Sequence, residues 1–123
     1  MGEQREDADE MVRSALGAVS AEQWRALEQF VDAFLDADRS DRARPLEAVL
    51  GALYAMDLIV GFDWPSWSEA RRYFDGDPIE DPVVAVKFLT AVVRADRFSE
   101  GTLDDAVDSG VFGAALRALC RSD

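Results

Sequence analysis

The chain is 123 residues long, the size of one domain, and 49% of its residues are hydrophobic, enough for a packed core. Its 25 acidic side chains outnumber 13 basic ones, and the net charge of −12 disfavours binding to nucleic acids and anionic membranes, which need clustered cations. The absence of histidine excludes a histidine general base, a histidine-containing catalytic triad and a histidine zinc site.

The N-terminal segment is strongly acidic: residues 1–10 carry five acids and one arginine. We expect a solvated tail or the frayed start of a helix here, and a first helix over about 6–18. The segment resembles neither a signal peptide nor a transit peptide, and no apolar run approaches the roughly 20 residues of a membrane span. We therefore expect a cytoplasmic protein in which residues 11–123 form a single domain.

The clearest helical signal follows at residue 20. Ser20 and Gln23 fit a capping box, in which each side chain bonds the backbone N–H of the other residue. Apolar residues then recur at helical spacing from Trp24 to Leu35, with charged residues between them. This pattern predicts an amphipathic helix that ends at the charged connector 38–42.

The middle of the chain predicts two further helices and a turn. Pro45 suits the first turn of a helix whose end the sequence leaves open, because residues 57–61 fit either a last turn or a short extended piece. Residues 62–67, with proline at position 65, predict a turn. Ser66 starts a second capping box and a short helix to about Phe74.

The C-terminal part predicts three helices. Asp81 is an N-cap followed by Pro82 at the first helical position, and this helix is expected to end near residue 97. A short helix starts at Thr102, and Gly110 separates it from a last apolar-striped helix. No strand pattern or repeat is present, so we predict a compact all-α bundle of five to seven helices, some of them short.

Two aspartates fall inside the apolar arcs of predicted helices, where an unpaired carboxylate is costly. For Asp57, the simplest interpretation is that its helix stops before it. For Asp96, one interpretation is that it accepts backbone N–H groups or an arginine at the turn into the Thr102 helix. The other is a buried ion pair lining a cleft, with these candidate arginines: Arg71, Arg72, Arg94 and Arg97.

The aromatic turn offers a second choice. Trp64 and Trp67 flank Pro65 and Ser66, and they either fill the core where the chain turns or form an exposed aromatic platform for a partner. Tyr73 and Phe74 lie close enough in sequence to extend either arrangement.

The residue types present leave few kinds of catalytic site open to this chain. The sequence has no glycine-rich phosphate loop and no EF-hand spacing, and we expect no cofactor or metal. Cys120 is the only cysteine, so it cannot form an internal disulfide, and we expect it to be a small core residue of the last helix. An enzyme would have to rely on carboxylates, arginine, tyrosine or a bound hard cation.

The acidity itself has two explanations that the sequence leaves open. Asp provides 16 of the 25 acids, and 12 of the 13 bases are arginine. This composition is typical of a halophilic, salt-accumulating cytoplasm, where molar salt screens self-repulsion. A GC-rich genome also depletes lysine.

Two segments carry a family resemblance: Phe62–Trp67, and Leu89–Leu103 with its continuation through Gly110. They resemble motifs of small uncharacterised haloarchaeal and actinobacterial proteins that are classed as a domain of unknown function. The resemblance spans roughly residues 58–119 and leaves the N-terminal third unmatched. It implies an intracellular helical domain, supplies no activity, and directs attention to residues 96–101.

Three hypotheses of function follow. The first is a non-catalytic interaction or regulatory module that binds a protein partner or self-associates. The second is a small-molecule or anion-binding protein, either with or without enzymatic activity. The third, nucleic-acid binding, survives only if several arginines form one face. The candidate binding residues are Trp64, Trp67, Arg71, Asp96, Arg97 and Glu100.

Overall fold

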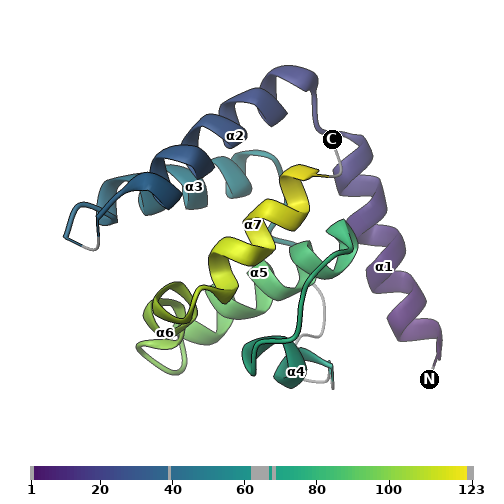
Figure 1. Ribbon diagram of the computed structural model, residues 1–123. Helices are drawn as coiled ribbons and strands as arrows, with labels where there is room; N and C mark the ends of the chain where they lie inside the picture. Colours follow the sequence, from purple (N-terminus) through teal and green to yellow (C-terminus); the bar gives the residue numbers. More distant parts are fainter. Residues whose placement is uncertain (1, 39, 62–66, 68, 122–123) are drawn as a thin grey trace.

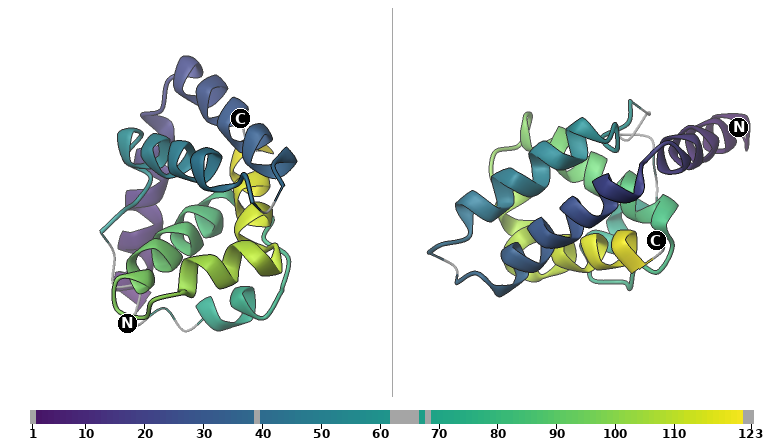
Figure 2. Two further views of the ribbon diagram at one scale, coloured as in Figure 1. Left: turned by 90° about the vertical axis from the view of Figure 1, so that its left-hand side faces the viewer. Right: turned by 90° about the horizontal axis from the view of Figure 1, so that it is seen from above.

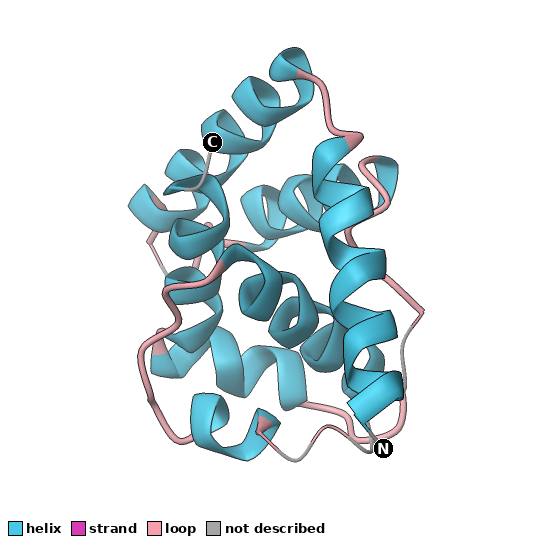
Figure 3. Ribbon diagram, turned by 90° about the vertical axis from the view of Figure 1, so that its right-hand side faces the viewer, coloured by secondary structure: helices cyan, strands magenta, loops and turns pink. Residues whose placement is uncertain are grey.

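The computed structural model describes the backbone of residues 2–38, 40–61, 67 and 69–121. Within these residues the protein is all-α, with seven helices and no strand, which confirms the predicted fold class (Figure 3). The helices are α1 (Gly2–Gly17), α2 (Ala21–Asp36), α3 (Ala43–Ala55), α4 (Ala70–Phe74), α5 (Pro82–Asp96), α6 (Thr102–Ser109) and α7 (Val111–Arg121).

Two helix starts form as their sequence signals predict. The Ser20 hydroxyl accepts a hydrogen bond from the Gln23 backbone N–H at 3.1 Å, and the Gln23 side chain accepts one from the Ser20 N–H at 3.0 Å. The Asp81 carboxylate accepts from the Val83 N–H at 2.8 Å, and Pro82 occupies the first helical position. These bonds satisfy N–H groups that have no partner inside the helix.

Two helix starts differ from the sequence prediction, those of α1 and α4. Helix α1 begins at Gly2 and not near residue 6. Helix α3 begins at Ala43, so Pro45 lies in its first turn as expected. Helix α4 is shorter than predicted, with Glu69 at its N-cap. The predicted capping residue Ser66 lies outside the described residues.

Helix α5 is the centre of the fold. Residues 85–92 are all buried, because their side chains are almost entirely apolar and four other helices, α1, α4, α6 and α7, pack around them (Figure 1). A helix that is hydrophobic on all sides requires this kind of enclosure. Helix α2 packs against α3 and against α7, so the α2–α3 pair lies as a second layer over the α5–α7 pair (Figure 2).

The chain leaves α3 through a tight reversal. Helix α3 ends at Ala55, and Asp57 adopts a left-handed conformation with φ of 58°. The N–H of Leu58 reaches the carbonyl of Leu53 at 2.9 Å, and the N–H of Asp57 reaches the carbonyl of Tyr54 at 3.1 Å. This pair of bonds is a Schellman motif, which usually has glycine where Asp57 stands. The interpretation that the helix stops before Asp57 is therefore confirmed.

A buried threonine anchors the segment that follows. Thr90 of α5 is fully buried, and its hydroxyl accepts a hydrogen bond from the Val60 N–H at 3.2 Å and donates one to the Leu58 carbonyl at 3.4 Å. Residues 58–60 are non-helical and buried, so their backbone groups need such partners. One side chain thus fixes the exit of α3 against the central helix.

Candidate functional site

The candidate site begins at the junction of α5 and α6, the segment Asp96–Gly101, which we call the α5–α6 corner. One carboxylate oxygen of Asp96 accepts hydrogen bonds from the backbone N–H of Gly101 at 3.2 Å and of Leu103 at 3.1 Å. Gly101 is the N-cap residue of α6 and has no side chain to cap it. Asp96 supplies the missing cap from the preceding helix, as one of the two sequence interpretations proposed.

The same corner presents three side chains to solvent. Arg97, Phe98 and Glu100 are all exposed, and Phe98 is 83% exposed. The next most exposed large apolar side chain in the described part of the chain is Met11, at 45%. The corner therefore combines a backbone that Asp96 holds in place with a largely exposed aromatic side chain and with exposed side chains of both charges.

Trp67 belongs to the core and not to this corner. It is 8% exposed and stacks on Tyr73 with ring centroids 5.8 Å apart. The Tyr73 ring in turn meets Phe88 of α5 edge-on at 6.5 Å. For Trp67, filling the core is therefore the correct interpretation. The other predicted tryptophan, Trp64, lies outside the described residues.

A buried lysine lies beside Trp67, and no sequence pattern predicted its role. Lys87, the single lysine of the chain, is 5% exposed, and its Nζ lies 5.0 Å from the centre of the Trp67 ring. The same Nζ donates to a carboxylate oxygen of Asp9 at 3.1 Å. This ion pair joins α1 to α5. Its sequence signal was a lone lysine within the apolar run of α5.

The predicted binding residues that the structure describes lie near opposite ends of α5. Lys87, which contacts Trp67, and Asp96 are nine positions apart on this helix, a distance of about 14 Å along its axis. Arg97 and Glu100 lie with Asp96 at the corner. The structure thus brings together three of the predicted residues and leaves Trp67 elsewhere.

The arginines of α4 lie on the surface. Arg71 and Arg72 are exposed, and Arg72 donates to the Asp77 carboxylate at 2.9 Å. That hydrogen bond raises the pKa of Arg72 above its ordinary value, and the guanidinium, like that of any arginine, is charged at neutral pH. Arg94, another candidate partner, is half-buried in the last turn of α5.

A groove of about 460 Å³ lies between α1 and the end of α3. Most of its lining residues are apolar, but polar atoms make up almost half of the surface that the groove exposes, and the polar residues are Ser14, Gln23 and Asp57. The larger apolar side chains lining it are Met11, Met56, Ile59 and Val60. No residue of the α5–α6 corner lines this groove, so it is a separate surface feature.

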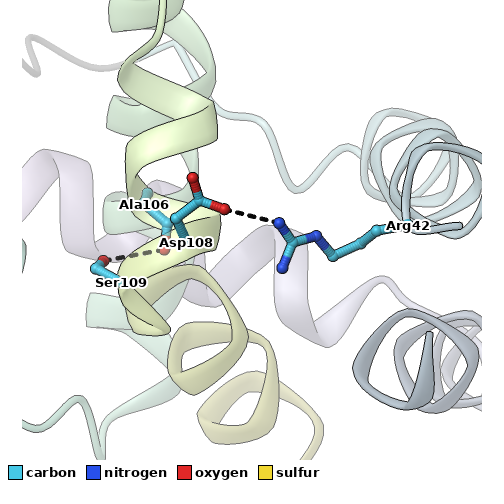
Figure 4. Close-up of polar contacts among 4 residues, drawn as sticks. All are labelled: Arg42, Ala106, Asp108 and Ser109. Atoms are coloured by element: carbon cyan, nitrogen blue, oxygen red, sulfur yellow. Dashed lines mark hydrogen bonds and ion pairs between the residues drawn. The ribbon is translucent and has the colours of Figure 1, made fainter. Parts of the chain in front are cut away.

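A smaller hollow of about 150 Å³ lies where α6 and α7 meet the end of α2. Arg42, from the connector between α2 and α3, lines it and donates to Asp108 of α6 at 2.8 Å (Figure 4). Next to it, the Ser109 hydroxyl donates to the Ala106 carbonyl at 3.2 Å. The Arg42–Asp108 pair therefore ties the two helical layers together on this side.

Neither a metal cluster nor a membrane-spanning helix is found in the described part of the chain. No three potential ligand side chains gather there closely enough to hold a metal ion. None of its helices has both the length and the apolarity that crossing a bilayer requires.

Fold and sequence together define the class as a small all-α protein. The chain belongs to DUF6508, a family of unknown function, whose sequence profile matches residues 39–122. The match covers α3 to α7 and leaves α1 and α2 outside. It confirms the resemblance to a domain of unknown function and adds no activity. No curated protein and no solved structure is similar enough to count as a match.

Proposed function

We propose that the protein is a non-catalytic interaction module that self-associates through the α5–α6 corner. The observation that carries this proposal is the 83% exposure of Phe98 on a corner whose backbone Asp96 holds in place. Exposing a phenylalanine to water is unfavourable, and burying it against an apolar partner stabilises by about 2 kcal/mol. A corner already ordered before contact loses little further conformational entropy on binding.

The charges around Phe98 favour a second copy of the chain as the partner. Arg97 precedes Phe98 and Glu100 follows it, so the exposed side chains of the corner include one positive and one negative charge. In a two-fold symmetric contact the same surface meets itself. An axis near Phe98 would set Arg97 of each copy against Glu100 of the other, with the two rings between them.

The proposed contact is weak and depends on salt. A stable interface buries about 800 Å² on each partner, more than one corner provides. Two copies that each carry a net charge of −12 also repel one another at low ionic strength. At about 1 M salt the screening length falls to about 3 Å, and this long-range repulsion is largely removed. We therefore expect a transient dimer that strengthens with salt.

Sedimentation velocity in about 1 M KCl, from micromolar to millimolar protein, tests the proposal. We expect the average mass of the wild-type protein to rise toward that of a dimer with concentration. Phe98→Ser should remain a monomer. Tyr54→Ser, which removes another exposed aromatic residue, should associate like the wild type. A wild-type protein that stays monomeric at millimolar concentration, or equal behaviour of the two variants, would overturn the proposal.

A further inference from the structure

We propose that the groove between α1 and the end of α3 is a second interaction site, and that it binds the apolar face of an amphipathic helix from a positively charged protein partner. This site shares no residue with the α5–α6 corner. The proposal therefore stands or falls independently of self-association.

The groove lining includes apolar side chains that can contact the apolar face of a partner helix. Met11 of α1 and Met56 at the exit of α3 both line the groove, as do Ile59 and Val60. Met11 is exposed, and the other three side chains are buried, so they form the floor of the groove. Apart from Met1, Met11 and Met56 are the only methionines in the chain. Methionine is unbranched and polarisable, so it adapts to side chains of different shape and is favoured at helix-binding surfaces.

The site is also partly open to water before any partner binds. Met11 is 45% exposed, although it is a large apolar side chain beside other apolar groups. Covering it would remove this apolar surface from solvent. The groove's volume of about 460 Å³ is comparable to that of small-molecule pockets, which is room for a few apolar side chains.

The negative charge of the protein favours a basic partner over an acidic one. Asp57 lies exposed at the groove, and its left-handed turn fixes the position of its backbone. The groove lining includes no arginine and no lysine. With a net charge of −12 on the whole chain, approach of a basic segment is favoured at long range and approach of an acidic one is opposed.

The test uses a fluorescent model peptide of about 18 residues, with leucine on one helical face and lysine elsewhere. Binding is measured by fluorescence anisotropy against the wild-type protein and two variants. Ala55→Arg places a long side chain in the groove. Ala33→Arg makes the same change of charge on an exposed position of α2 that does not line the groove.

We expect Ala55→Arg to weaken binding at least about tenfold and Ala33→Arg to change it less than about twofold. Methyl NMR of methionine-labelled protein should show the Met11 and Met56 signals shifting as the peptide is added. A glutamate-for-lysine peptide should not bind. Equal weakening by the two variants would mean that the peptide responds only to the net charge of the protein and does not occupy the groove. This result would overturn the proposal. The proposal would also be overturned if the Met11 and Met56 signals did not shift, or if the lysine peptide did not bind.

Discussion

At the scale of single residues, Asp96 shows how position separates one carboxylate from a strongly acidic background. Its place inside an apolar arc, just before a turn, was readable from the sequence, and the structure gives it two backbone N–H partners. The exposure of Phe98 two positions later was not readable. It depends on where the corner lies relative to the rest of the fold, which no local pattern specifies.

The cap formed by Asp96 predicts a measurable loss of stability on truncation. Asp96→Ala leaves the N–H groups of Gly101 and Leu103 without their acceptor and should lower the free energy of unfolding by about 1 kcal/mol. Asp96→Asn keeps an acceptor oxygen and should lose less. Urea denaturation provides the measurement, with Asp32→Ala, on an exposed position of α2, as the control. A loss no larger than that of the control would contradict the role of the cap.

The left-handed turn at Asp57 predicts a change of the opposite sign. This conformation costs most side chains about 1–2 kcal/mol, and glycine adopts it freely. Asp57→Gly should therefore raise the free energy of unfolding by about 1 kcal/mol. The same replacement within a helix, Asp32→Gly, should lower it by about the same amount. If both variants are destabilised to the same degree, the Schellman turn is not under strain.

At the scale of elements, local signals located most helices but said little about how they pack. Capping residues at Ser20 and Asp81 marked the starts of α2 and α5. The contact between Lys87 and Asp9 joins positions 78 residues apart, and nothing in either neighbourhood indicates the other. The groove between α1 and α3 was missed for the same reason, because it exists only once both helices are in place.

The Lys87–Asp9 pair predicts how α1 is held. Helix α1 makes its main packing contact with α5, so loss of the pair should loosen α1 before the rest of the fold. Lys87→Met keeps an apolar stem but removes a charge-assisted hydrogen bond worth about 2 kcal/mol. Hydrogen exchange of α1 amides should accelerate roughly 30-fold, while buried α5 amides keep their protection.

Arg13→Met is the matched control for that experiment, because it removes a cation from an exposed position on α1 itself. Its exchange pattern should resemble that of the wild type. Uniform acceleration across α1 and α5 in Lys87→Met would show that the pair supports the whole fold and does not act as a local anchor for one helix.

At the scale of the whole molecule, the charge predicts salt-dependent stability. A net charge of −12 destabilises the compact state at low ionic strength, and the Arg42–Asp108 and Arg72–Asp77 ion pairs lie at the surface, where such pairs contribute little. Raising KCl from about 0.1 to about 1 M should therefore move the urea midpoint upward. A midpoint that stays constant or falls would show that attractive pairs outweigh the repulsion. Chloride is preferred to sulfate, which stabilises most proteins by exclusion.

The central claim, self-association through the α5–α6 corner, is tested most directly by exchanging its two charges. Arg97→Glu and Glu100→Arg should each abolish the dimer, since each leaves like charges facing across the two-fold axis. Mixing the two variants should restore a dimer, because every contact then joins opposite charges. Sedimentation velocity at millimolar protein in about 0.15 M KCl, where short-range pairs still act, compares the equimolar mixture with the wild-type protein. A mixture that remains as monomeric as its components, at a concentration where the wild type associates, would contradict the account.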